Sequence, residues 1–319
     1  MSSARRIVVA LGGNAISPEG GLNDISAQFA QTRETAVPLV DILADGHRLL
    51  ITHGNGPQVG KILRRVELAA HEVYPIDLGL CVADSQAGMG YMICQCMTNE
   101  LLRRNMEARA CTIVTTVLVD AADPALRNPT KPIGSFHNEE NARVHRTRDG
   151  WIMKEFPGHG FRRVVPSPRP LKIQELGQIQ ALFNAGELVV AGGGGGIPVI
   201  ERPDGAFEGV EAVVDKDLTA ALLGVGVRAD VLIIVTGVDR VCLNFDTPDQ
   251  TSLEYMTVSQ AREHLQAGQF PPGSMGPKIE AAIQFLEESG RKDAQVVITS
   301  IGGLTDSLAS RTGTRIVRD

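Results

Sequence analysis

Short runs of apolar residues alternate along this chain with longer segments that have a helix-like pattern. The apolar runs are rich in Val, Ile and Leu, and they predict strands at 6–11, 48–52, 112–119, 187–191, 230–236, 295–299 and 314–317. Most of the segments between them predict helices, for example at 25–45, 58–72, 83–106, 171–185, 216–226, 257–267 and 277–289. Strands that are apolar throughout and separated by helices are typical of a mostly parallel sheet covered on both faces, so the pattern predicts an α/β fold.

The stretch from Asp120 to Pro170 breaks this alternation. It is rich in proline, basic residues and aromatic residues, among them Trp151 and Phe156. Because a structureless loop of this length is uncommon in a compact protein, we expect a small inserted subdomain or lid.

Composition excludes several classes of protein. The 319 residues suffice for one large domain or two lobes, and a hydrophobic content of 43% is that of an ordinary globular protein. A net charge of -6 argues against a nucleic-acid or anionic-membrane partner. The first apolar run stops at Gly12, which is too early for a signal peptide or membrane span. Five cysteines without a C-x-x-C pair predict reduced thiols and a cytoplasmic location.

Three of the predicted strands run directly into glycine turns, at 12–14, 53–57 and 192–196. Glycine lets backbone N–H groups approach an anion without obstruction, and we expect helices after the first two turns to add their positive N-terminal ends. The three turns therefore predict a site for several phosphate or carboxylate groups.

Three lysines elsewhere in the chain are candidates to complete this site, namely Lys131, Lys216 and Lys278. Lys216 lies between Asp215 and Asp217 at the predicted start of a helix. The two carboxylates either cap that helix, or Asp217 stays ionised and orients the lysine. Lys278 follows Pro277, which suits a first helical position, so a plain helix start is the alternative there.

Other familiar sites are not supported. The segment at 54–62 has the wrong spacing for a P-loop and lacks the hydroxyl after its lysine, and it is only a weak dinucleotide fingerprint. None of the seven histidines has another His or a Cys at metal-ligand spacing, so no protein metal site is predicted. His53, inside a glycine turn, is the histidine expected nearest the site.

Taken together, the motifs closely resemble those of the carbamate kinases, which belong to the amino acid kinase family. The matching segments run in order from about residue 6 to Arg315, at 8–15, 52–60, 128–134, 162–170, 193–198, 209–218 and 273–278. The resemblance implies an open αβα sandwich with a mostly parallel sheet of about eight strands. It also implies a homodimer, an amino-terminal lobe at 1–186 for carbamate or carbamoyl phosphate, a protruding lid at about 120–166, and an ATP-binding lobe at 187–319.

The resemblance also implies the reaction and its residues. ATP and carbamate would give ADP and carbamoyl phosphate reversibly, with ATP synthesis favoured, in the breakdown of arginine or related nitrogen compounds, and Mg²⁺ would accompany the nucleotide. The implied catalytic residues are Lys131, Lys216, Asp217 and Lys278. Those around carbamate and the transferring group are Gly12, Gly13, Asn14, Gly54, Asn55 and Gly56. Those for ATP are Gly193, Gly194, Gly195, Lys216, Thr236, Gly237, Val238, Met275, Gly276 and Lys278.

The chain departs from the family motifs at two places. It has Gly237 where the family usually has aspartate, which predicts altered nucleotide affinity with catalysis retained. After Gly134 it reads Ser135-Phe136-His137, where the family usually has Pro, then Phe or Val, then Tyr.

Two alternative functions stay open. The first is a relative with another acceptor, such as acetylglutamate, UMP or aspartate, although such relatives generally place a lysine in the first turn and this chain has none before Lys61. The second is a nucleotide-binding relative that has lost catalysis.

Overall fold

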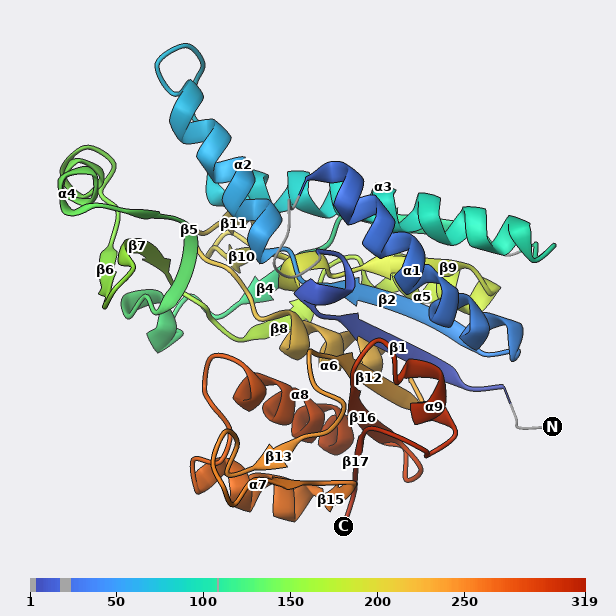
Figure 1. Ribbon diagram of the computed structural model, residues 1–319. Coiled ribbons are helices and arrows are strands. Elements are labelled where there is room, and N and C mark those ends of the chain that lie inside the picture. The colour runs from blue at the N-terminus through green and yellow to red at the C-terminus, as the bar shows by residue number, and fades with distance from the viewer. Residues whose placement is uncertain (1–3, 18–23, 108) are drawn as a thin grey trace.

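The computed structural model describes residues 4–17, 24–107 and 109–319. Their centre is an eight-stranded sheet (Figure 1). Within the described part of this sheet, neighbouring strands pair in parallel except for β16 and β17. The strands lie in the order β15 (Tyr255–Thr257), β17 (Thr314–Val317), β16 (Gln295–Thr299), β12 (Val231–Val235), β1 (Arg6–Leu11), β2 (Arg48–His53), β9 (Leu188–Ala191) and β3 (Ala110–Ile113). The predicted fold class and the mostly parallel sheet are confirmed.

Strand β1 shows how the apolar runs bury both faces of the sheet. Its odd-numbered residues Ile7 and Val9 pack in one core, and the even-numbered Val8 and Ala10 pack in the other. The first core is covered by α1 (Ile25–Ala44), α3 (Leu78–Arg103) and α9 (Leu304–Leu308), and the second by α5 (Leu176–Ala185), α6 (Lys216–Gly226), α7 (Val258–Gln266) and α8 (Met275–Glu288). Alternate side chains of an extended strand point to opposite faces, so a continuous apolar run is what a doubly covered strand requires.

Local sequence signals set the ends of several helices. Asp24 and Asp77 cap α1 and α3 by accepting hydrogen bonds from backbone N–H groups three residues on. Thr257 and Gln260 form a reciprocal capping box at the start of α7. Gly186 ends α5 with a φ of 91°, a left-handed conformation that glycine adopts without steric cost.

Two predicted elements are wrong in part. The run at 112–119 is split into β3 and β4 (Thr116–Val119), which belong to different sheets. The break occurs where the Gln86 side chain donates to the Thr115 carbonyl at 3.1 Å and accepts from the Thr115 N–H at 2.8 Å. The segment predicted as a helix at 171–185 begins as strand β8 (Pro170–Ile173), which pairs antiparallel with β4 before α5 starts.

Strands β4 and β8 belong to a second sheet beside the first. It has four strands in the order β11 (Phe207–Gly209), β10 (Ile197–Glu201), β4 and β8. A small hairpin of β13 (Cys242–Leu243) and β14 (Thr251–Ser252) lies toward the carboxyl-terminal part of the molecule (Figure 1).

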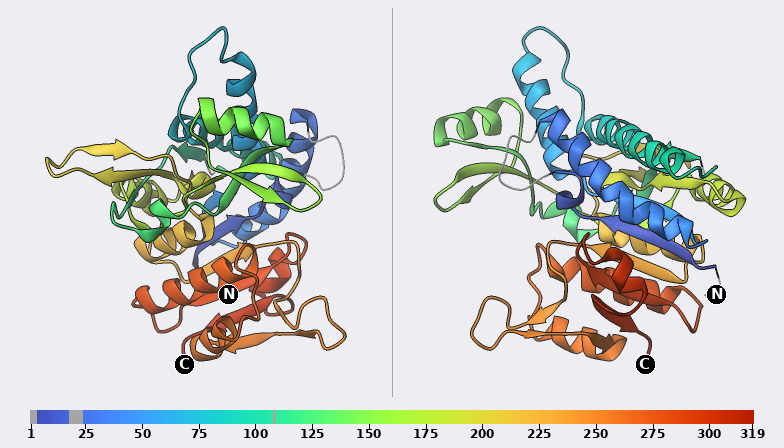
Figure 2. Two further views of the ribbon diagram at one scale, coloured as in Figure 1. Left: turned by 90° about the vertical axis from the view of Figure 1, so that its left-hand side faces the viewer. Right: turned by 45° about the vertical axis from the view of Figure 1, so that its right-hand side comes forward.

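The irregular stretch of the sequence forms a projection of its own, which we call the lid. It contains the three-stranded sheet of β5 (Lys131–His137), β7 (Gly160–Val165) and β6 (Met153–Phe156), with α4 (Glu139–Arg148) between β5 and β6. The lid projects from the main body near α2 (Gly56–Ala69) (Figures 1 and 2). A β-bulge interrupts β5 between Ile133 and Phe136, where Gly134 has a φ of 70°.

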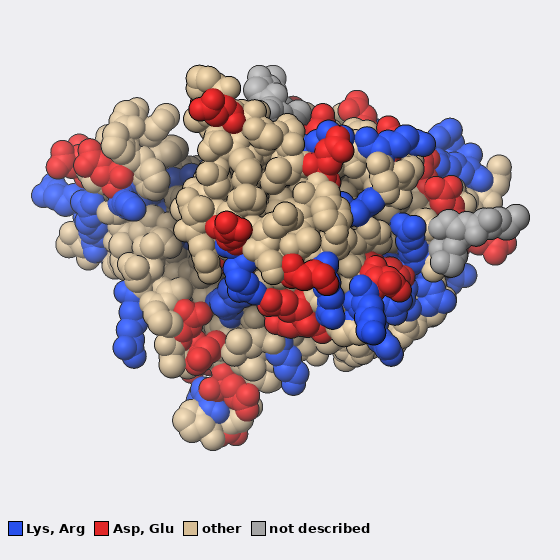
Figure 3. Space-filling view, turned by 90° about the horizontal axis from the view of Figure 1, so that it is seen from below, with Lys and Arg blue, Asp and Glu red and all other residues tan. Residues whose placement is uncertain are grey.

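Acidic and basic side chains are interspersed across the face seen from below in Figure 3. Among the described residues, the helices lack the combination of length and apolarity needed to cross a membrane. The five cysteines are free thiols, of which Cys81 and Cys96 are buried and the other three are partly buried.

Candidate active site

Asp217 lies between two lysine ammonium groups in the first turn of α6. Its Oδ1 accepts a hydrogen bond from Lys216 Nζ at 2.5 Å, and its Oδ2 accepts one from Lys278 Nζ at 2.8 Å. Lys278 comes from the first turn of α8, which begins at Met275, two residues before the predicted proline start. One carboxylate therefore holds two cations from two helices in fixed positions.

Burial and charge act in opposite directions on this group. Burial alone would raise the pKa of Asp217, but the charges and hydrogen bonds of Lys216 and Lys278 outweigh it and lower the pKa to about 2. Burial lowers the pKa of Lys216, and the attraction of Asp217 opposes that change. Asp217 is thus an anion at neutral pH and does not carry a proton to or from a reacting group.

Lys131 reaches the same place from the lid. It is the first residue of β5, and its Nζ donates to Asp215 Oδ2 at 3.1 Å. Asp215 is also the N-cap of α6, since its side chain accepts from the Asp217 N–H at 3.0 Å. The capping interpretation therefore holds for Asp215. The Lys131 side chain is 39% exposed, so its ion pair is the more accessible and weaker one.

The three glycine turns meet at the carboxyl ends of β1, β2 and β9, which are neighbours in the sheet. A Cβ on Gly12 would lie 2.8 Å from the Val235 carbonyl oxygen, so the first turn packs directly on the end of β12. Gly194 has a φ of 65°, and a Cβ there would lie 2.1 Å from Asn55 Nδ2. Both positions need glycine because side chains would prevent the turns from packing together.

Helices are expected after the first two glycine turns. In the described part of the chain, the turn at 53–57 leads directly into an α-helix and the turn at 12–14 does not. Helix α2 starts at Gly56, and the side chain of its N-cap Asn55 donates to Ser85 Oγ at 2.7 Å instead of capping the helix. The first turn continues into a three-residue 3-10 turn, Gly13–Ala15, so the expected positive end of an α-helix does not adjoin it, whereas the helix predicted at 25–45 is confirmed as α1. The side chain of Asn14 lies outside the described part of the structure.

Two adjoining cavities lie beside the lysines. The first, of about 190 Å³, is lined by Gly12, Gly13, Ala15, Lys216, Val235, Thr236, Gly237, Lys278 and Ile301. The second, of about 260 Å³, is lined by Thr236, Gly237, Val238, Arg240, Cys242, Phe245, Gln269, Phe270, Pro271, Ser274 and Met275. Both contain Thr236 and Gly237, so a cationic cavity adjoins a pocket with aromatic and thioether side chains.

Several residues predicted to lie at or near the site do not line either of these two cavities. The Gly276 N–H donates to the Pro271 carbonyl at 2.9 Å, and the Gly195 carbonyl accepts from Thr219 Oγ1 at 2.7 Å. His53 is buried with its Nδ1 3.1 Å from the Gly54 carbonyl oxygen. Burial, together with the charge of Lys216, lowers the pKa of His53 to about 4, so its ring is neutral. The sequence offered no signal for Phe245 and Phe270, which stand on separate loops.

Comparison with known proteins adds independent information. The model of the amino acid kinase family matches residues 5–300. A carbamate kinase-like protein of Escherichia coli is 42% identical, with 98% of each chain covered. A carbamate kinase of Clostridium perfringens is 43% identical, with 98% of this chain and 100% of the other covered. The structure of carbamate kinase from Giardia lamblia bound to AMP-PNP superimposes with a TM-score of 0.93 at 40% identity and covers both chains completely.

Proposed function

The chain belongs to the amino acid kinase family, and from this premise we propose that it is a carbamate kinase, which transfers a phosphoryl group reversibly between ATP and carbamate. The observation that carries the proposal is the group of three lysine ammonium ions held by Asp215 and Asp217 beside the glycine turns. Phosphoryl transfer asks a protein mainly for positioning and for positive charge around the transferring oxygens, which this group can supply.

The nucleotide would lie across the two adjoining cavities. The base would occupy the pocket with Phe245, Phe270 and Met275, and the phosphates would reach Lys216 and Lys278 in the smaller cavity. Mg²⁺ would enter with the nucleotide as part of the substrate, held by phosphate oxygens and water, because the Asp215 and Asp217 carboxylates are already paired with lysines.

Carbamate would lie against the turns at 12–14 and 54–56, where α2 begins without a side-chain cap and its first turn has backbone N–H groups that the helix itself does not pair. Carbamate attacks through an oxygen that is already anionic, so no general base is required. This agrees with an Asp217 that is ionised and paired with two lysines. Lys131 would bring the third positive charge from the lid to the phosphoryl group. There it would stabilise the negative charge that is redistributed during the transfer.

The wider setting follows from the same proposal. An amino-terminal lobe at 1–186 would bind the acceptor and a lobe at 187–319 the nucleotide, in a cytoplasmic homodimer. The exposed Tyr91 and Leu102 on α3 and the edge strand β3 are candidates for the dimer surface. Carbamoyl phosphate is a reactive mixed anhydride, so the enzyme would run toward ATP in the breakdown of arginine or related nitrogen compounds.

The decisive experiment measures ATP formation from ADP and carbamoyl phosphate with Mg²⁺. Lys131→Ala should lower kcat/KM on the order of a hundredfold, equivalent to about 2.7 kcal/mol of transition-state stabilisation. Lys154→Ala is the matched control, because Lys154 is an exposed lysine on lid strand β6. An inactive parent protein would point to a different acceptor or to a silent relative, and a screen of carboxylate and phosphate acceptors with ATP would separate these two.

A further inference from the structure

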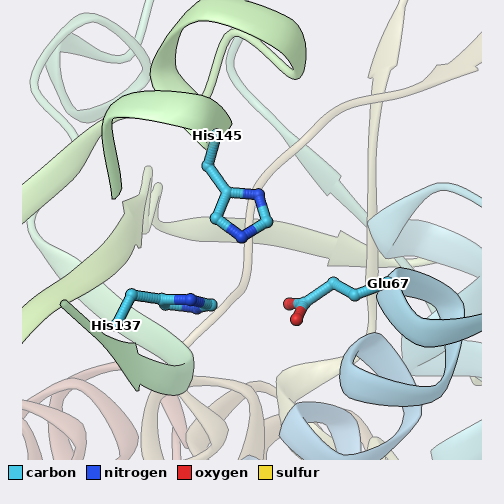
Figure 4. A group of neighbouring side chains, drawn as sticks. All are labelled: Glu67, His137 and His145. Atoms are coloured by element: carbon cyan, nitrogen blue, oxygen red, sulfur yellow. The ribbon is translucent and has the colours of Figure 1, made fainter. Parts of the chain in front are cut away.

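The lid carries two histidines that meet a glutamate of the main body outside the active site. His137 ends β5, His145 lies in α4, and Glu67 lies in α2. Each offers one ligand atom, and these atoms lie within 4.8 Å of one another. Figure 4 shows the two imidazole rings and the carboxylate converging on one point. Sequence spacing could not find this group because the glutamate is far from both histidines along the chain.

We propose that Glu67, His137 and His145 bind a divalent transition metal ion, best matched by Zn²⁺, which fastens the lid to helix α2. Two imidazoles and one carboxylate form a ligand set that zinc uses in three-ligand sites, with water as the fourth ligand. Tetrahedral bonds of zinc place ligand atoms roughly 3.4 Å apart. The ligand atoms now lie within 4.8 Å of one another, so binding would draw them together by up to about 1.4 Å.

The hydrogen bond behind His145 is a second, independent sign of a metal site. Its Nδ1 lies 2.7 Å from Asp149 Oδ2, which fixes the tautomer that carries a proton on Nδ1 and leaves the Nε2 lone pair free. Metal-bound histidines are regularly oriented by a carboxylate in this way, and such partners raise the basicity of the ligand.

Packing holds the ligands in place. The His145 ring stacks on Trp151 with centroids 4.4 Å apart, and His137 meets His145 edge-on at 4.7 Å. Glu67 is 8% exposed, and Arg64 donates to its Oε2 at 2.8 Å, so Oε1 is the oxygen available to an ion. The ligand side chains are therefore closely packed and largely shielded from solvent, which suits a bound ion.

A route to the site exists beside it. A cavity of about 870 Å³ between α2 and the lid is lined by Glu67, Asp149 and Trp151, among others. This cavity can deliver the ion and hold the water that completes its coordination.

The position of the site determines its role. Strand β5 carries Lys131 at its start and His137 at its end, and α2 begins at the second glycine turn. The lid already packs on α2 through the buried Ile133 and Val165, and the ion would extend that contact outward. His137 stands where the family motif has tyrosine, so the site would be a property of this chain.

The test uses the full-length protein after dialysis against a chelator. Zn²⁺ affinity is measured by competition with a chromophoric chelator, and Co²⁺ is added separately to look for the visible absorption of a four-coordinate site. We expect one Zn²⁺ per chain in the parent. His137→Tyr, which keeps an aromatic ring, and Glu67→Gln should each weaken binding roughly a hundredfold, and Asp149→Asn about ten- to a hundredfold.

His159→Tyr is the matched control, since His159 is an exposed lid histidine outside the group. It should bind Zn²⁺ like the parent, and Zn²⁺ should raise the Tm of both but not that of His137→Tyr. The proposal is overturned if the parent gives no four-coordinate Co²⁺ spectrum, or if its Zn²⁺ affinity equals that of His137→Tyr and Glu67→Gln. The Co²⁺ spectrum of the parent decides the matter even if a variant fails to fold.

Discussion

Lys278 Nζ donates a 2.8 Å hydrogen bond to Asp217 Oδ2 although the two residues are 61 positions apart in the chain. This bond joins the first turns of α6 and α8, and a 2.5 Å bond from Lys216 occupies the other carboxylate oxygen. Asp217 is thus the common anchor of two cations, Lys216 and Lys278, that line the smaller of the two adjoining cavities.

Asp217→Asn should therefore damage both stability and catalysis. An amide leaves two neighbouring ammonium groups without their counter-ion, and breaking a buried ion pair costs about 3–5 kcal/mol. We expect ATP formation to fall at least about a hundredfold, measured by initial rates, with the stability loss measured by urea unfolding. Asp41→Asn, which removes the partly exposed partner of Arg104, is the control and should cost about 1 kcal/mol or less. Equal losses in both variants would contradict the anchor role.

The stabilisation by Asp217 should disappear in acid. Because Lys216 and Lys278 outweigh burial and hold its pKa in the folded protein at about 2, below the ordinary 3.8, the ionised form stabilises the fold above pH 4. That contribution is lost as the pH falls through the window from about 4 to 2. Urea unfolding of the parent and Asp217→Asn across this range should show their difference in unfolding free energy shrinking. A difference that stays constant down to pH 2 would exclude the assigned charge.

The fall in kcat at alkaline pH should reflect the deprotonation of Lys216. Burial lowers its pKa below the usual 10.5, so activity should decline at a lower pH than the titration of an ordinary lysine would produce. Lys216→Arg keeps its charge at every accessible pH and should move this fall to higher pH even if its maximal rate is lower. The measurement is kcat against pH, each profile normalised to its own maximum. If the normalised profiles of the parent and Lys216→Arg coincide at alkaline pH, the fall in kcat belongs to another group.

Gly237→Asp should strengthen nucleotide binding with kcat largely retained. Gly237 lines both adjoining cavities, at the junction where the ribose would lie, and a carboxylate there can accept hydrogen bonds from ribose hydroxyls. One charge-assisted hydrogen bond corresponds to roughly a tenfold lower Kd for ADP by calorimetry. Gly237→Asn separates the effect of charge from that of size. An unchanged Kd in the aspartate variant would refute the idea that the departure affects nucleotide affinity.

Cys242 should be the thiol that nucleotide protects from alkylation. Cys242 lines the cavity of about 260 Å³ that contains Phe245 and Phe270. Burial raises the pKa of Cys81 to about 11 and that of Cys94 to about 12, so these two thiols are less reactive. Iodoacetamide near pH 7.5 should therefore label Cys242 first, as mapped by peptide mass spectrometry. ADP at about 100 times its Kd should slow that labelling roughly a hundredfold. Labelling that is indifferent to ADP would place the nucleotide elsewhere.

The parts of the fold that could be predicted are those set by local pattern. Strands β1 and β16 and helix α6 have the predicted bounds, because an apolar run marks each strand and the capping Asp215 marks the start of the helix. The split at Thr115 was not predictable, since it depends on the distant Gln86 side chain. The separate strand β8 likewise depends on its pairing with β4.

The same distinction applies to the sites. The lysines and glycine turns lie in motifs with their own local signature, and the structure brings Lys131, Lys216 and Lys278 to the two aspartates at the start of α6. The group of Glu67, His137 and His145 has no such signature. It exists only because β5 and α4 fold back on α2.

The bulge in β5 gives the lid a joint inside a single strand. Lys131 lies on one side of Gly134 and His137 on the other, and the register against β7 shifts between Ile133 and Phe136. A strand with a continuous ladder transmits displacement along its length, whereas a bulge with a left-handed glycine absorbs rotation locally. The two ends of β5 therefore pair with β7 in separate registers, and under the proposed function Lys131 would withdraw from a departing product while the outer end of the lid stays on α2.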